Sequence, residues 1–171
     1  MLRATLLRRI QAMLAIGTVL FIAIGSSATN VAAQQKITTP KEFFGHNIGD
    51  DYWLPNYTQF IGYWNKIAKE SNRTKLDTIG PSAEGRPQLS MIVSSPENIK
   101  NLAKYRDMAK KLAYAEIDEA TAKQFAKDGK AIVWIDGGLH ASEVLGANQL
   151  IETSYQMISG TDAETDRKSV V

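Results

Sequence analysis

His140 and Glu143 are the residues of this 171-residue chain whose types and spacing best suit metal chemistry. They lie in AIVWIDGGLHASEVLGANQL, residues 131–150, which holds one of only two histidines. Neutral imidazole and carboxylate are zinc ligands, and a catalytic zinc takes three protein ligands and one water. Zinc lowers the pKa of that water to about 7, which makes it a nucleophile for hydrolysis. Spacing alone favours a simpler interpretation, a partly exposed histidine beside a helix-start glutamate that the helix dipole stabilises.

The elements around the pair predict a site at the end of a strand. Residues 131–135 are wholly apolar, which is typical of a short central strand covered on both faces. The Asp-Gly-Gly run at 136–138 predicts a sharp turn, because glycine tolerates positive φ. A helix with one apolar face is expected over 142–159. We therefore expect His140 at the carboxyl end of a strand, where α/β sheets bind ligands, and Glu143 on the same helical face.

The preceding part of the chain predicts a helix followed by a hairpin. Apolar residues at helical spacing indicate an amphipathic helix over 57–70, with Asn56 as its N-cap. Two strands are expected around residues 76–79 and 89–93, joined by the turn at 80–85. Pro87 is expected at the entry of the second strand, because proline cannot donate to a central ladder.

Further helices complete the pattern. A helix through 98–115 begins either with Ser94 and Glu97 as a capping box or with Ser95 as the cap of Pro96. A second helix is expected near 118–128, ending at Gly129. The last two residues, 170–171, resemble the start of another buried strand. The predicted fold class is therefore α/β, a mixed sheet flanked by helices that forms an incomplete α/β/α domain.

Residues 1–33 have the pattern of a secretory signal peptide. Three arginines precede an apolar run at 12–25, and small residues end at Ala33, after which cleavage is expected. The run is shorter than the ~20 residues of a membrane span, although an uncleaved N-terminal anchor is the alternative. We expect a secreted or periplasmic protein with no membrane contact after cleavage. An N-terminal arm at 34–51 then leads into the domain proper, residues 52–171.

Composition excludes several functional classes. Removing residues 1–33 removes three positive charges and no negative ones, so the formal net charge of +2 falls to −1. The mature part therefore has no basic excess for binding nucleic acid. The chain has no cysteine, which excludes disulfides, thiol catalysis and thiolate zinc sites. The sequence sets no oligomeric state.

Two motifs together resemble a known family, the carboxypeptidase A-like zinc metallocarboxypeptidases. The first is the turn Ser-Ala-Glu-Gly-Arg-Pro at 82–87 between two strands, after a helix. The second is the segment IVWIDGGLHASEVLGANQLIETSYQMI, which contains the His140-x-x-Glu143 pair. The resemblance covers about residues 52–160 and keeps the order and spacing of the family's motifs.

The resemblance implies a mixed eight-stranded sheet between helices and one Zn²⁺ ion. His140 and Glu143 match the family's first two zinc ligands. The implied reaction is hydrolysis of a peptide bond in a peptide or protein substrate, usually at a C-terminal residue. Asp136 is a weaker candidate, either a hydrogen-bond partner of a metal-bound imidazole or the cap of the glycine turn.

Downstream of the pair, the chain departs from the family pattern. The family's third ligand is a downstream histidine, and this chain has no histidine after His140. The general-base glutamate also lies further on in the family, so no catalytic residue is identified in this chain. Ser142 stands where many carboxypeptidases have arginine. We expect a truncated N-terminal portion of the peptidase domain, or alternatively a non-catalytic secreted binding module derived from this fold.

Overall fold

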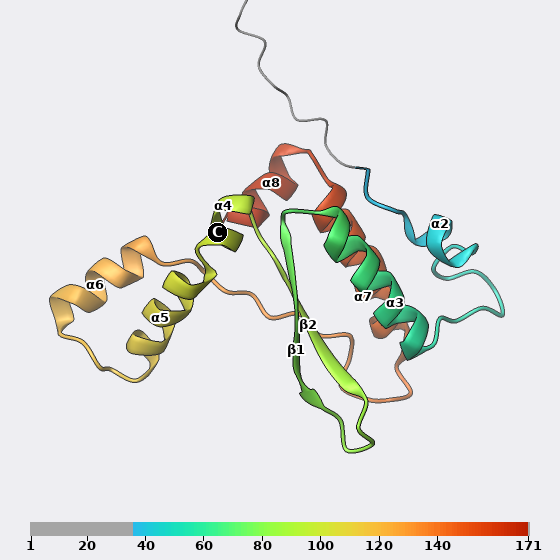
Figure 1. Ribbon diagram of the computed structural model, residues 1–171, viewed down its shortest axis with the longest axis horizontal. Coiled ribbons are helices and arrows are strands. Elements are labelled where there is room, and N and C mark those ends of the chain that lie inside the picture. Colours follow the sequence, from blue (N-terminus) through green and yellow to red (C-terminus); the bar gives the residue numbers. More distant parts are fainter. Residues whose placement is uncertain (1–35, 171) are drawn as a thin grey trace, which may run out of the picture. The chain divides into compact units, whose positions relative to one another are not determined.

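The computed structural model describes residues 36–170, with the side chains of residues 36–167, so the predicted signal peptide lies outside the described residues. In chain order the elements are α2 (Pro40–Phe44), α3 (Tyr57–Glu70), β1 (Thr74–Pro81), β2 (Pro87–Val93), α4 (Pro96–Lys100), α5 (Leu102–Ala113), α6 (Glu119–Asp128), α7 (Val144–Ser159) and α8 (Ala163–Val170) (Figure 1). The predicted combination of a β-sheet with flanking helices is confirmed. Across residues 36–170, none of the helices combines the length and apolarity that a membrane crossing requires.

Helix α3 has the bounds that the sequence predicts. The Asn56 side chain accepts a hydrogen bond from the Gln59 backbone at 3.0 Å, and the Gln59 side chain accepts one from the Asn56 N–H at 2.8 Å. This reciprocal capping box satisfies two backbone donors that a helix start otherwise leaves without partners. Tyr63, Trp64 and Ile67 form the buried face of the helix.

The hairpin of β1 and β2 is also present. The strands pair antiparallel, with Leu76 opposite Met91 and Thr78 opposite Leu89. Pro87 is the first residue of β2 and lies opposite Pro81, in the entry position that the sequence predicts. Side chains two residues apart point to the same face of a strand, so these pairs give the hairpin one apolar face.

The core lies where α3 and α7 pack on that face. Figure 1 shows the two helices side by side next to the hairpin, and α3 contacts β1 while α7 contacts β2. The indole N–H of Trp64 donates to the Ser154 hydroxyl at 3.1 Å, which joins the two helices inside the core. The buried members of the cluster are apolar or aromatic: Ile37, Tyr63, Trp64, Ile67, Ile151 and Ile158.

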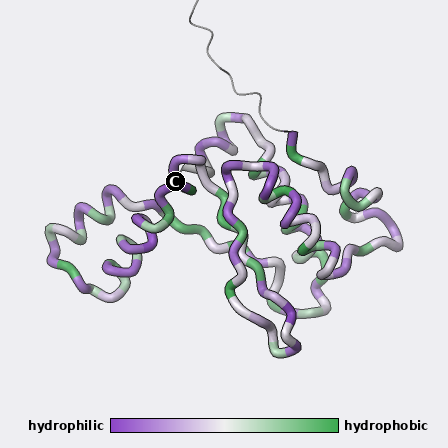
Figure 2. Tube along the Cα trace, viewed as in Figure 1, coloured by the Kyte–Doolittle hydropathy of each residue, from purple (hydrophilic) through white to green (hydrophobic). Residues whose placement is uncertain are grey.

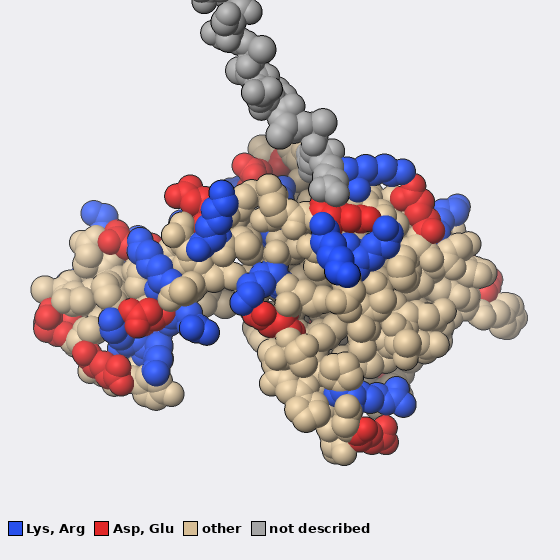
Figure 3. Space-filling view, in the orientation of Figure 1, with Lys and Arg blue, Asp and Glu red and all other residues tan. Residues whose placement is uncertain are grey.

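The helices after the hairpin begin at caps readable in the sequence. The Ser95 side chain accepts a hydrogen bond from the Asn98 backbone at 3.2 Å. Of the two predicted starts of α4, the structure therefore has the one with Ser95 as N-cap and Pro96 as the first helical residue. The predicted 98–115 helix is divided, because the chain breaks at Asn101 between α4 and α5. Asp118 caps α6 through the Thr121 backbone at 2.8 Å. On the face shown in Figure 3, acidic and basic side chains are interspersed.

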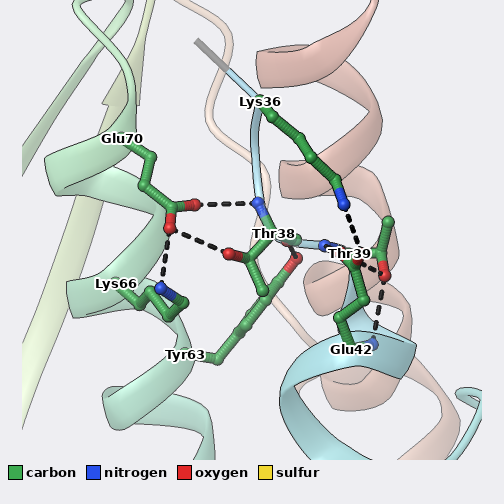
Figure 4. A network of polar contacts seen from close by, with 7 residues as sticks. All are labelled: Lys36, Thr38, Thr39, Glu42, Tyr63, Lys66 and Glu70. Atoms are coloured by element: carbon green, nitrogen blue, oxygen red, sulfur yellow. Dashed lines mark hydrogen bonds and ion pairs between the residues drawn. The ribbon is translucent and has the colours of Figure 1, made fainter.

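The N-terminal arm is held to α3 by a polar network (Figure 4). The Glu70 carboxylate accepts hydrogen bonds from the Thr38 backbone and hydroxyl, both at 2.8 Å, and pairs with Lys66. The Tyr63 hydroxyl donates to the Thr38 carbonyl at 3.0 Å. Burial raises the pKa of Glu70, but the hydrogen bonds from Lys66 and Thr38 outweigh it, and the pKa lies below its ordinary value. The arm is therefore docked, and it contains the short helix α2.

Two strand predictions are wrong. Residues 131–135 lie outside any sheet, and Ile132, Val133, Trp134 and Ile135 are 76, 75, 70 and 55% exposed. This hydrophobic stretch of the chain is visible as green tube in Figure 2. A strand needs a hydrogen-bonding neighbour, and within residues 36–170 β1 and β2 pair with each other alone. Val170 ends the helix α8 instead of beginning a strand.

Candidate metal centre

The glycine turn before α7 packs directly against the first turn of that helix. A Cβ atom added to Gly146 would lie 2.5 Å from the Gly137 carbonyl oxygen, and one added to Gly137 would lie 3.0 Å from the Ala147 Cα. Gly138 has φ +119°, a conformation that side chains disfavour. Glycine at these positions therefore lets the turn lie close to the helix, which places the next residues, 140–143, beside the start of α7.

His140 and Glu143 converge in this segment. The His140 Nδ1 atom lies 2.8 Å from the Glu143 Oε1 atom, and the His140 backbone N–H donates to the other carboxylate oxygen at 3.3 Å. The Glu143 N–H donates to the His140 carbonyl at 3.0 Å, which closes a turn between them. Because α7 begins at Val144, the two residues meet through this turn and do not share a helical face as expected.

Both side chains are accessible. They are 67% exposed for His140 and 55% for Glu143. Glu143 occupies the N-cap position of α7 but makes no capping hydrogen bond with its side chain. Its carboxylate is directed to His140 instead, so the pair presents an imidazole and a carboxylate together to the solvent side.

The pair has the ligand types of two neighbouring positions of a zinc site and nearly their spacing. Two ligand atoms about 2.05 Å from a tetrahedral zinc lie roughly 3.3 Å apart. The 2.8 Å separation of Nδ1 and Oε1 is therefore about half an ångström short of that spacing. Both side chains are more than half exposed, so neither is locked in place by packing. Among residues 36–170, no cluster of three His, Cys, Asp or Glu side chains has the arrangement of a metal site.

His46, the other histidine of the chain, packs against an aromatic residue. Its ring stacks on Trp53, with ring centroids 4.9 Å apart and an interplanar angle of 14°. This stacking gives His46 a packing role against Trp53.

Asp136 caps the glycine turn. Its Oδ1 atom accepts a hydrogen bond from the Gly138 N–H at 3.1 Å. This is one of the two alternatives for Asp136. The other, support of a metal-bound imidazole, stays a prediction because it concerns the metal-loaded site.

A cavity of about 430 Å³ opens beside the pair. Its walls come from Leu54 and Pro55 before α3, from the glycine turn, and from the first turns of α7. Most of this lining is apolar or glycine backbone, and the polar side chains in it belong to His140, Glu143 and Asn148. Sequence reasoning missed Asn148. Asn148 lies on the apolar face of α7, which continues at Ile151 and Ile158. A polar residue on such a face could have pointed to Asn148 from the sequence.

The chain was compared with known proteins in three ways. A family model described as Zinc carboxypeptidase matches residues 60–168, more than half of the chain. The comparisons with curated proteins and with solved structures each found no match. The matched range contains the hairpin, the glycine turn, both candidate ligands and the helix that positions them. The chain therefore belongs to the zinc carboxypeptidase family.

Proposed function

We propose that His140 and Glu143 are two zinc ligands and that the chain serves zinc-dependent hydrolysis of peptide bonds in peptides or proteins. The observation that carries this proposal is the 2.8 Å approach of His140 Nδ1 to Glu143 Oε1 beside an open cavity. Family membership supports the same reaction, since zinc carboxypeptidases use this metal.

Each residue has a distinct part in holding the metal. The imidazole of His140 binds as a neutral donor, and the carboxylate of Glu143 adds a negative charge that offsets the charge of the cation. When bound, zinc supplies Lewis acidity and an activated water. The backbone hydrogen bond from His140 to Glu143 keeps the carboxylate turned toward the ring. A complete catalytic site also needs a third protein ligand and a general base, which these two residues do not supply.

Zinc titration of single variants tests this proposal. Zinc affinity is measured by competition with a chromophoric chelator for the chain and for His140→Ala, Glu143→Ala and His46→Ala. Loss of either proposed ligand should weaken binding by more than the ~10-fold that removal of a ligand's hydrogen-bond partner costs. His46→Ala is the matched control and should bind zinc like the unmodified chain, because its ring packs on Trp53. Equal zinc affinity in all four proteins would sink the proposal.

Peptide hydrolysis is assayed in parallel, with zinc added and with a chelator. The proposed reaction requires cleavage that depends on zinc and is lost in Glu143→Ala. Zinc binding without any cleavage would leave the metal site standing and remove the peptidase activity from this chain.

We also propose that the protein is exported, on the basis of the pattern in residues 1–33. The test is the intact mass of the chain recovered outside the cytoplasm of an expressing cell. Cleavage after Ala33 predicts a product that begins at Gln34. A product that keeps residues 1–33 would instead favour the uncleaved anchor.

A further inference from the structure

Asn148 differs from the other polar residues that the fold buries. Among residues 36–167, four polar residues are buried, Thr74, Asn98, Asn148 and Ser154, and Asn148 is 9% exposed. Thr74 donates to the Ala68 carbonyl, Asn98 donates to the Ser94 hydroxyl at 3.0 Å, and Ser154 donates to the Ile151 carbonyl at 2.9 Å. Within residues 36–170, by contrast, the Asn148 side chain has no hydrogen-bond partner. The amide is not among the fully enclosed polar atoms that lack a partner, so it keeps contact with the cavity that Asn148 lines.

The position of Asn148 indicates what its amide is for. Asn148 lines the same cavity as His140 and Glu143, among the apolar neighbours Val144 and Ala147. Ligand sites are typically apolar cavities with a few polar groups that orient the ligand. An asparagine amide has one carbonyl acceptor and one NH₂ donor, so it complements the N–H and C=O of a peptide group.

We propose that Asn148 is a substrate-binding residue whose side-chain amide pairs with a backbone amide of the bound peptide. This inference rests on the proposed peptidase function, which supplies the class of ligand. Asn148 binds and orients the peptide in the cavity beside the candidate metal ligands. It takes no part in holding the metal.

A peptide and its ester analogue test the pairing. The dissociation constants of N-acetyl-Ala-Ala, and of the analogue with an ester in place of the Ala–Ala amide, are measured by NMR titration of the full chain in EDTA. The full chain should bind the amide about fivefold more tightly than the ester, because the ester lacks the N–H donor. Asn148→Ala should weaken amide binding about fivefold and abolish the preference. Unchanged affinity and preference in Asn148→Ala, or no binding by the full chain, would overturn the inference.

Asn98→Ala is the matched control, since Asn98 is the other buried asparagine and its amide is already bonded to Ser94. This variant should unfold more easily and bind both probes as the full chain does. Asn148→Leu adds a second measurement, the thermal midpoint of unfolding. A structural role for the amide would lower this midpoint, whereas a binding role would not. The thermal midpoint of Asn148→Leu should equal or exceed that of the full chain, because leucine fills a similar volume and no protein hydrogen bond is lost with the amide. A clear fall in the midpoint would show that the protein itself needs the amide, and would overturn the binding role.

The two proposals fail separately. The peptide titration is done in EDTA and does not involve zinc. If the chain bound no zinc, the proposed metal site would be wrong, but the peptide affinities of the full chain and Asn148→Ala could still be compared. Conversely, Asn148→Ala should retain the zinc affinity of the full chain. A loss of zinc affinity in Asn148→Ala would overturn the assignment of Asn148 to the peptide.

Discussion

The candidate site depends on how closely two glycines approach each other. The Gly137 carbonyl lies where a side chain on Gly146 would begin, and this contact brings the turn that bears His140 and Glu143 onto the start of α7. The His140 and Glu143 side chains are themselves exposed, so their convergence comes from backbone geometry and from their mutual hydrogen bond. A change that moves the turn should therefore damage the site without touching either candidate ligand.

Gly146→Ala tests this dependence. The added Cβ would meet the Gly137 oxygen at 2.5 Å, so we expect the variant to be destabilised by about 1–3 kcal/mol, as overpacked sites are. Zinc affinity should fall with it. Urea unfolding and zinc competition are the measurements.

Gly62→Ala is the matched control for that substitution. It replaces glycine in α3, where the new Cβ would meet only the end of the Phe43 ring at 3.4 Å. There the better helix propensity of alanine should leave stability equal or higher, by up to about 1 kcal/mol. If Gly146→Ala and Gly62→Ala have the same free energy of unfolding, the close approach of Gly146 to Gly137 does not contribute to stability.

At the scale of the elements, hydrogen bonds at the helix starts and on the arm determine where segments begin and how they dock. The Asn56–Gln59 capping box begins α3, the helix that carries much of the buried core. Asn56, the N-cap of the same helix, comes directly after Leu54 and Pro55, which line the cavity. The C-terminal end of α3 holds the arm through Glu70. Helix α3 thus connects the arm, the core and one wall of the cavity.

Asn56→Ala should lower the free energy of unfolding by about 1 kcal/mol, because the Gln59 N–H loses its capping acceptor. Chemical denaturation followed by circular dichroism measures the change. Asn65→Ala is the control within the same helix, since the Asn65 side chain donates to the Ile61 carbonyl on the exposed side and caps nothing. Equal losses in the two variants would contradict a specific capping role.

The start of α2, within the arm, should weaken in acid. The hydrogen bond from Lys36 and those from Thr39 lower the pKa of Glu42 from 4.5 to about 2. A carboxyl group whose pKa is depressed in the folded state stabilises that state above its unfolded pKa, and this contribution is lost as pH falls. The loss is therefore expected between pH 4.5 and about 2.

Thermal midpoints of the chain and of Glu42→Gln across this range provide the measurement. The unmodified chain should lose stability more steeply with falling pH than the variant, which has no carboxyl group to protonate at position 42. Glu116→Gln is the control, because the Glu116 carboxylate has no hydrogen bond within residues 36–170. Parallel pH profiles for the chain and Glu42→Gln would rule out this contribution.

For the molecule as a whole, two groups of apolar residues in the described part of the chain differ sharply in burial. One group forms the core between α3, α7 and the hairpin, where Ile151 is 0% exposed. The other lies in residues 131–135 and in Leu139 and Leu145, which are largely exposed. Burial removes apolar surface from water and stabilises the fold, whereas the exposed group contributes little to it.

One pair of isoleucine substitutions separates these groups. Ile151→Ala should cost about 2–5 kcal/mol, because it leaves a cavity in the core. Ile132→Ala should change the free energy of unfolding by less than about 0.5 kcal/mol, since Ile132 is 76% exposed. Urea titration of both variants gives the comparison. A large loss in Ile132→Ala would show that residues 131–135 are buried in solution.

Local features of the fold were predictable because their causes lie within a few residues. Asn56, Ser95 and Asp118 cap the helices that follow them, and a cap needs only the next three residues. The helical apolar spacing of α3 and α7 and the two strands of the hairpin are likewise local patterns. His140 and Glu143 drew attention by residue type and spacing, but the resemblance to the zinc metallocarboxypeptidases was needed to make them candidate ligands.

How those parts meet depends on the folded chain. Residues 131–135 have the composition of a buried strand, yet strand formation depends on a neighbour that contributes hydrogen bonds from elsewhere in the chain. The meeting of His140 with Glu143 through a turn depends on Gly137 lying against Gly146. The burial of Asn148 at the cavity depends on which face of α7 packs on the core. Pairing, close approach and burial are relations between separate segments, and a local pattern predicts the segments but not those relations.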